Sequence, residues 1–241
     1  MSNPIFNNPM IAKKIRGVIQ GGASIGEEIP DWDKINVKNR VFIEPIPDLF
    51  PILCNNAKMK EGGKEDQWGF DEIHQHNTDK WCFNVALSDY DGEAEFHIST
   101  GSFCSSSLMD FTPEAKKYGD ELVTERLIKV PVRKVDTLVE KYKIPLEKFN
   151  CLYLDVQGNE YKALVGAAET IKKMDFLFVE VNHVELYKDS VLWGQFSEFI
   201  KSLGWRLATI RNHESEKNNH FVTYQSEALF FNQHVTADFF K

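Results

Sequence analysis

Residues 17–28, GVIQGGASIGEE, place four glycines between a short apolar run and two glutamates. Apolar residues that lead into glycines and then into a polar segment predict a strand, a tight turn and a helix. In that geometry a ligand approaches backbone N–H groups at the start of the helix. Phosphates commonly use such turns, but Glu27 and Glu28 stand where a bound pyrophosphate would be repelled. The turn therefore predicts a nucleotide-type site and leaves the ligand open.

The rest of the chain alternates short apolar runs with stretches of helical spacing. Such runs are typical of strands buried on both faces of a parallel sheet, and the alternation predicts an α/β sandwich. The predicted strands are residues 17–20, 41–44, 83–87, 151–156 and 176–181. The helical stripes are Leu49, Ile52, Leu53 and Ala57 (with Asp48 as N-cap), then Tyr161, Leu164, Val165 and Ala168, then Trp193, Phe196, Phe199, Ile200 and Leu203.

Two segments depart from this alternation of strands and helices. Residues 92–99 alternate apolar and polar side chains, which predicts a half-exposed strand. Residues 220–232 contain two strand-like runs after a polar loop at 211–220, which predicts a C-terminal antiparallel hairpin at the sheet edge. We expect one domain over 1–241, with an N-terminal extension at 1–16 and loop insertions at 64–81 and 211–220.

Composition limits the partners and the compartment. The formal charge of −8, from 28 basic and 36 acidic residues, argues against non-specific nucleic-acid binding, which needs a basic surface. The four cysteines show no CxxC spacing, and Cys82 and Cys151 lie in strand-like runs, as expected of reduced core residues. The first 17 residues lack a continuous apolar stretch. We expect a cytoplasmic protein without a membrane anchor.

Glu44 ends the second predicted strand, 18 positions after Gly26. A carboxylate only accepts hydrogen bonds and can take two, so an acid at this position suits both hydroxyls of a ribose. A solvated acid at a strand end is the alternative. Paired with the glycine turn, Glu44 favours ribose binding, but the pair does not separate NAD from S-adenosylmethionine, because both carry adenosine.

Two features favour S-adenosylmethionine. Ala23 replaces the middle glycine of the dinucleotide turn, which lets the backbone approach pyrophosphate, and a sulfonium cofactor has no phosphate. Asp155 ends an apolar strand and is expected to project into the cleft at the carboxyl edge of the sheet. Helix capping is the alternative for Asp155 and is the preferred interpretation for Glu160.

Several segments in series resemble the FkbM-type methyltransferases. They are GGASIGEE, VFIEPIPDLFPILCNNA, NVALSDYDGEAEFHIS, SFCSSSL, VPVRKVDTLVE, LYLDVQGNEYKALVGAAETI and FVEV, between about Gly17 and Val181. The resemblance implies a Rossmann-like class I methyltransferase sandwich, mostly parallel, that binds S-adenosyl-L-methionine. It also implies methylation of oxygen, often of a sugar hydroxyl.

The resemblance also implies roles for individual residues. The methionine part and ribose of the cofactor would lie against Gly21, Gly22, Ala23, Ser24 and Gly26. The ribose would be held by Glu44, with Pro45 beside it, and the adenine would lie between Ala86, Leu87 and Ser88. Asp155 would line the methyl-transfer site. The chain departs from the family at Gln20, where an acid is usual, and at Gln157, where a glutamate is usual; glutamine keeps hydrogen-bonding capacity but loses charge.

Methyl transfer to a hydroxyl needs alignment and removal of a proton. The candidate bases are Asp155, Glu180 and His183, although a histidine after a strand is more often structural. The same three residues could gather a divalent cation; no structural metal is predicted and a catalytic one is left open. The histidines of residues 74–76 are expected to be solvated.

Two loops remain open in role. Residues 101–108 read as a surface connection whose hydroxyls could also meet cofactor or acceptor. Trp68, Phe70 and Trp81 of the insertion could stack on a sugar or cover the core. The sequence thus favours an O-methyltransferase acting on a small-molecule or glycan acceptor. A cofactor-fold binding module and a nicotinamide-dependent oxidoreductase are the alternatives, and the oligomeric state is open.

Overall fold

The computed structural model describes residues 6, 8–59, 74–77, 79–101, 103–120, 122–217, 220–235 and 239. Trp68 and Phe70 of the predicted stacking insertion lie outside these residues, as do the side chains of residues 74–76. Within the described part, no helix has the length and apolar character that a membrane span requires.

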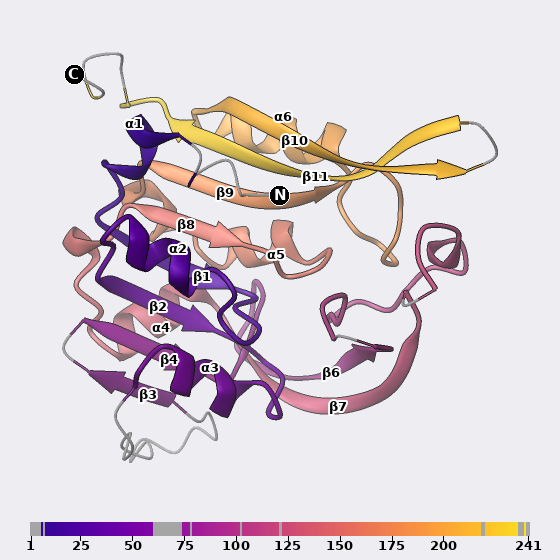
Figure 1. The fold of residues 1–241 in the computed structure, drawn as a ribbon, viewed down its shortest axis with the longest axis horizontal. Helices are drawn as coiled ribbons and strands as arrows, with labels where there is room; N and C mark the ends of the chain where they lie inside the picture. Colours follow the sequence, from indigo (N-terminus) through magenta and orange to yellow (C-terminus); the bar gives the residue numbers. More distant parts are fainter. Residues whose placement is uncertain are drawn as a thin grey trace.

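The fold is built on an eight-stranded sheet with a parallel centre (Figure 1). The strand order is β10-β11-β9-β8-β1-β2-β4-β3. The parallel strands are β1 (Gly17–Gly21), β2 (Asn39–Ile43), β4 (Lys80–Phe83), β8 (Cys151–Leu154) and β9 (Phe176–Asn182). The antiparallel strands are β3 (His74–Asn77) at one edge, and β11 (His220–Asn232) and β10 (Trp205–Lys217) at the other.

Helices cover both faces of this sheet, which makes it a Rossmann-like α/β sandwich and confirms the predicted fold class. One face packs against α1 (Pro9–Ala12), α2 (Ile29–Lys34) and α3 (Phe50–Asn56). The other face packs against α4 (Val135–Lys141), α5 (Glu160–Val165) and α6 (Trp193–Ser202). From the predicted N-terminal extension, Ile11 and Ile15 join the first face, where they are buried in the cluster around Trp32.

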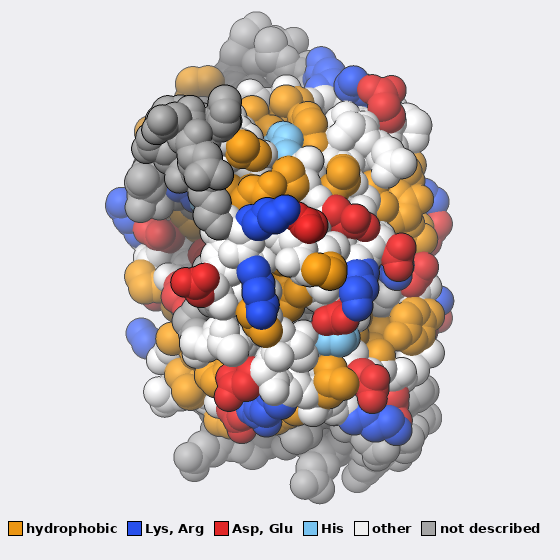
Figure 2. Space-filling model, turned by 90° about the vertical axis from the view of Figure 1, so that its right-hand side faces the viewer, with side chains coloured by type: hydrophobic (Ala, Val, Ile, Leu, Met, Phe, Trp, Pro, Cys, Tyr) orange, Lys and Arg blue, Asp and Glu red, His pale blue; other side chains and the backbone are white. Residues whose placement is uncertain are grey.

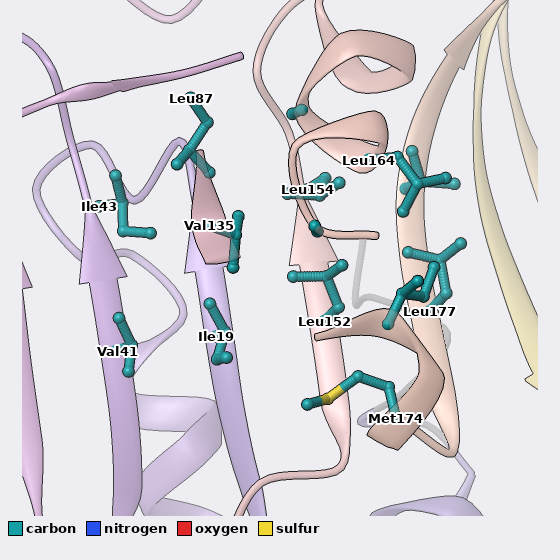
Figure 3. Packing of buried hydrophobic residues seen from close by; sticks show 14 of the residues in the cluster. Ile19, Val41, Ile43, Leu87, Val135, Leu152, Leu154, Leu164, Met174 and Leu177 are labelled. Atoms are coloured by element: carbon teal, nitrogen blue, oxygen red, sulfur yellow. The ribbon is translucent and has the colours of Figure 1, made fainter. Parts of the chain in front are cut away.

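The central strands are apolar throughout because both of their faces are buried. Ile19, Val41 and Leu152 come from three neighbouring strands and lie in one row across them (Figure 3). They belong to the same hydrophobic cluster as residues of α4 and α5. Full burial of such a side chain contributes about 1.5–3 kcal/mol. The runs that predicted strands therefore also supply the core. Cys82 and Cys151 are buried in it as thiols.

A second, three-stranded sheet stands beside the first at the lower right of Figure 1. It has the order β5 (Ala86–Leu87), β7 (Thr124–Arg133) and β6 (Gly92–Ser99). Between β6 and β7, the described part of residues 100–123, which includes η1 (Ala115–Lys117), folds back onto the segment after β9. Phe111 forms a β-bridge with Tyr187, and the Thr112 N–H donates to the Leu186 carbonyl at 2.9 Å. The predicted half-exposed strand is thus confirmed as β6.

Three predictions about local structure were wrong. The helix α3 has Leu49 as its N-cap, and Asp48 instead forms an ion pair with Arg126 at 2.8 Å. Within the predicted loop at 211–220, residues 211–217 instead continue β10, because pairing with β11 supplies their backbone hydrogen bonds. The C-terminal antiparallel hairpin is therefore formed by β10 and β11, and residues 220–232 are one of its strands instead of two. The run at 83–87 is divided between β4 and β5, which belong to different sheets. Two further short 3₁₀ turns are η2 (Leu146–Lys148) and η3 (Ile171–Lys173).

Candidate active site

The glycine turn connects β1 to α2 and passes directly against the end of β8. Gly22 has φ +75°, and a Cβ there would lie 1.7 Å from the carbonyl oxygen of Asp155. Gly26 has φ +85°. Both positions therefore require glycine, since other residues rarely adopt this backbone conformation and a side chain at Gly22 has no room. The predicted strand, turn and helix are confirmed.

Glu44 follows β2 and is tied to the glycine turn. Its Oε2 accepts the N–H of Ser24 at 2.8 Å, and its Oε1 accepts the N–H of Ile46 at 2.8 Å. The residue is only 4% exposed, which excludes the alternative of a solvated acid. Burial raises the pKa of Glu44 to about 7 against these two hydrogen bonds, which lower it.

A cavity opens between the glycine turn, the end of β2 and the second sheet. It encloses about 910 Å³ between atoms, including its opening to solvent. The predicted cofactor residues that line it are Gly22, Ser24, Glu44, Pro45, Ala86, Leu87 and Asp155. Residues as far apart in the chain as Ser24 and Asp155 therefore share one wall.

The other predicted cofactor residues lie behind this lining. Gly21 packs so closely that a Cβ would lie 2.6 Å from the Leu87 side chain. Ala23 is fully buried in the core cluster that contains α2. The Ser88 carbonyl lies against Gly166, where a Cβ would meet it at 2.0 Å. These residues, with Gly26, shape the turn and the strand ends, and their contact with a cofactor stays a prediction.

The cavity also has an apolar wall that the sequence did not indicate. Ile46 and Leu49 follow Glu44, while Phe96, Phe103 and Leu108 come from β6 and the segment after it. These side chains belong to one hydrophobic cluster with Ala86. The alternation in β6 marks Phe96 as buried, but only the folding back of residues 100–123 brings Phe103 and Leu108 to the cavity. An apolar wall beside Ala86 suits a flat heteroaromatic ring.

Gln20 forms hydrogen bonds with a residue of α2 and with one acid that lines the cavity. It is buried, and its Oε1 accepts the indole N–H of Trp32 at 3.0 Å. Its Nε2 donates to Glu28 Oε2 at 2.8 Å, and Glu28 lines the cavity. Burial is the main cause that raises the pKa of Glu28. Gln20 therefore orients an acid at the site without carrying charge itself.

Asp155 and Glu180 lie side by side at the carboxyl ends of β8 and β9. The amide of Gln157 joins them: its Nε2 lies 2.6 Å from Asp155 Oδ1 and 2.9 Å from Glu180 Oε2. Burial raises the pKa of Asp155 to about 7 and holds the pKa of Glu180 well above its usual value. The structure thus brings together two of the three predicted bases.

Glu160 completes a group of three acids. Its Oε1 accepts the N–H groups of Val156 and Gly158, in the loop before α5, at 2.9 and 3.2 Å, so it holds this loop instead of capping the helix as predicted. Burial raises its pKa to about 8. One oxygen from each of Asp155, Glu160 and Glu180 lies within 4.8 Å of the others, a spacing that could hold a divalent cation.

His183 bonds to β11 rather than to these acids. Its Nε2 lies 2.6 Å from Ser226 Oγ, and that hydroxyl donates to Asn212 Oδ1 at 2.9 Å. Because the serine proton is directed at Asn212, the imidazole Nε2–H is the donor to Ser226. Burial lowers the pKa of His183. This geometry favours the structural alternative for His183, and a catalytic role stays a prediction.

The molecule is viewed in Figure 2 from the side toward which the parallel strands point. Acidic and basic side chains alternate there with hydrophobic ones and form no patch of one sign. The glycine turn, the buried acid after β2 and the acids at the ends of β8 and β9 all lie at this end of the sheet. Open α/β sheets bind their ligands at this edge. Fold and site together define an α/β protein with a ligand-sized cavity at the carboxyl edge of its parallel strands.

Comparison with known proteins identifies the family. A family model described as the methyltransferase FkbM domain matches residues 20–207, and the chain belongs to this family. The chain is also 31% identical over 111 residues to the 2-O-methyltransferase NoeI of Sinorhizobium fredii. That match covers 44% of this chain and 45% of the relative, so the chain spans about half the length of the curated relative.

Solved structures give a weaker likeness. A protein from Pyrococcus horikoshii described as a candidate RNA methyltransferase matches with a TM-score of 0.43 and 10% identity, over 90% of this chain and 74% of that one. An uncharacterized protein from Listeria monocytogenes serotype 4b matches with a TM-score of 0.44 and 7% identity, over 96% of this chain and 68% of that one. Membership of the FkbM family rests on the match to the family model.

Proposed function

We propose that this protein is an S-adenosylmethionine-dependent O-methyltransferase that acts on a hydroxyl of a sugar or glycan. The observation that carries the proposal is the shared cavity wall: Glu44, held by the glycine turn, and Asp155, at the end of β8, both line it. Family membership supports methyl transfer. The name of the Sinorhizobium relative supports oxygen as the acceptor atom, and the family resemblance supports a sugar.

The residues present fit this cofactor. The backbone at Gly22 packs directly against the Asp155 carbonyl, and this tight turn needs no phosphate. Each oxygen of Glu44 accepts one backbone N–H, and each has a second lone pair, so the carboxylate can still accept two ribose hydroxyls. Ala86 and Ile46 offer apolar contact to adenine. Glu28 and Asp155 supply negative charge near a sulfonium.

When bound, S-adenosylmethionine supplies an electrophilic methyl group. The chain's own residues have two tasks: to align the acceptor hydroxyl and to receive its proton. Alignment supplies much of the acceleration in such a reaction. Asp155 is the group that receives the proton, because it lines the cavity and its pKa of about 7 suits a base at neutral pH.

The proposal is tested in two stages. Thermal unfolding is followed with S-adenosylmethionine, S-adenosylhomocysteine and NAD side by side, since a ligand of the folded state raises its stability. Stabilisation by the first two and not by NAD is expected. Labelled cofactor is then incubated with a panel of hexose and deoxysugar glycosides, and label is expected in an ether linkage. Stabilisation by NAD alone would overturn the proposal, and tight cofactor binding without transfer to any acceptor would favour a binding module.

A further inference from the structure

Gln157 uses both ends of its amide. A primary amide has two N–H donors, so Nε2 can give one to Asp155 Oδ1 and the other to Glu180 Oε2. Its Oε1 accepts the hydroxyl proton of Tyr187 at 2.7 Å. The reverse orientation of the amide would direct an oxygen at two carboxylates, so the partners fix which end is which.

The backbone that carries this amide is held from two sides. Gln157 has φ +54°, a conformation that non-glycine residues adopt only where the surroundings hold it. Its carbonyl oxygen accepts the hydroxyl of Ser107 at 2.6 Å. On the other side, a Cβ at Gly158 would lie 2.6 Å from the ring of Tyr187. The loop therefore has little freedom to swing the amide away from the acids.

We propose that Gln157 is a positioning residue for methyl transfer, an inference that rests on the proposed function. Its amide holds Asp155 and Glu180 in one orientation, so that Asp155 takes the acceptor's proton through its second oxygen, Oδ2. The hydroxyl O–H bond breaks as the proton passes to Asp155. The acceptor oxygen uses an electron pair to form the O–CH₃ bond, and the S–CH₃ bond breaks with its electrons left on sulfur.

This arrangement has a consequence for pH dependence. Burial raises the pKa values of Asp155 and Glu180, and the hydrogen bonds from Gln157 act in the opposite direction by favouring the ionised forms. Loss of those bonds should raise both pKa values. The acidic limb of the plot of kcat against pH should then move to higher pH. The other titratable groups around the pair are Glu28, Glu44, Tyr153, Glu160, Tyr187, His213 and Glu227, and Arg211 pairs with Glu227.

The test compares Gln157→Met with Gln225→Met. Methionine matches glutamine in length and removes the donors. Gln225 Nε2 donates to Glu180 Oε2 at 3.0 Å, so its loss removes a bond to Glu180 and leaves the Gln157 bridge to Asp155 in place. In Gln157→Met, kcat should fall about 10- to 100-fold, and the acidic limb should move up by about half to one pH unit. The Kd for S-adenosylhomocysteine should change less than about threefold. Gln225→Met should lose less activity and keep the position of the limb.

A titration that needs no acceptor completes the test. The ¹³C carboxyl resonance of Asp155, assigned with Asp155→Asn, is followed against pH in the wild type and in Gln157→Met. A higher Asp155 pKa in the variant supports the inference, and an unchanged pKa overturns it. A lower melting temperature with an unmoved acidic limb would also overturn it, because that pattern marks a purely structural role. A wild type that binds no S-adenosylhomocysteine would instead defeat the proposed function, while the titration would still decide whether Gln157 holds Asp155.

Discussion

The two ends of the candidate site are held in different ways. At the end near the glycine turn, the Glu44 carboxylate is held by backbone N–H groups of Ser24 and Ile46. At the other end, Asp155 and Glu180 are joined by a side-chain amide. Substitutions other than proline leave a backbone donor in place, whereas a change at Gln157 removes both side-chain donors at once. The donors that orient Glu44, at the binding end, are therefore harder to remove by substitution than those that orient Asp155 and Glu180, at the reacting end.

The largest effect is expected at the reacting end. Asp155→Asn keeps the shape of the side chain but cannot take a proton, so kcat should fall about 100-fold or more. Folding should be retained, since a buried carboxyl with a raised pKa becomes a neutral amide. Turnover with labelled cofactor measures the loss, and melting temperature checks the fold.

The exposed Asp189 provides a matched control, because its backbone φ of +60° suits asparagine. Asp189→Asn should keep wild-type turnover. Wild-type turnover in Asp155→Asn would remove Asp155 from the chemistry and leave the acid pair without a catalytic role.

The next effect is expected at the binding end. Glu44→Ala should weaken binding of S-adenosylhomocysteine by about 2–3 kcal/mol, because charge-assisted hydrogen bonds are lost. It should also destabilise the fold by about 1–3 kcal/mol, since the buried N–H groups of Ser24 and Ile46 lose their acceptor. Calorimetric titration and denaturant unfolding measure the two losses.

Glu44→Gln separates the two roles of this carboxylate. The amide oxygen can serve one of the two backbone donors, so this variant should fold better than Glu44→Ala and still bind weakly. Unaltered affinity in both variants would show that the backbone-held acid does not contact the cofactor.

A smaller effect on turnover is expected at His183, because its hydrogen bond runs to Ser226 in β11 and away from the acid pair. His183→Ala should keep kcat within about threefold and lower stability by about 1 kcal/mol for the lost hydrogen bond. A hundredfold loss of kcat with normal cofactor binding would instead restore His183 as the base.

The same contrast explains how far the sequence could predict the site. Glu44 and the glycine turn lie within one strand-turn-helix-strand unit, where spacing along the chain determines position. Gln157 reaches Glu180 only because β8 and β9 pair in register, which no local pattern reveals. Phe103 reaches the cavity because residues 100–123 fold back. The polar residues 211–217 resemble a loop in sequence, and only their pairing with β11 makes them part of a strand.

The smallest effect on turnover is expected at Glu160, where the buried acid bonds backbone groups. The folded pKa of about 8 lies above the ordinary glutamate pKa of 4.5, so the folded state binds more protons than the unfolded state between these values. The contribution of Glu160 to stability is therefore fully present at low pH and is lost as pH rises from about 4.5 through about 8. Glu44 and Asp155, each with a pKa of about 7, act in the same direction. The melting temperature of the wild type should fall over this range.

Glu160→Gln removes one of these titrations and keeps an acceptor for the N–H groups of Val156 and Gly158. The free energy of unfolding of the variant, relative to wild type, should be roughly 1–3 kcal/mol higher at pH 8.5 than at pH 5. This difference corresponds to a few °C in melting temperature. Its kcat should stay within about threefold. Scanning calorimetry of both proteins from pH 5 to 8.5 measures how steeply the melting temperature of each depends on pH. Parallel slopes would mean that Glu160 is ionised in the folded protein and that burial does not govern its titration.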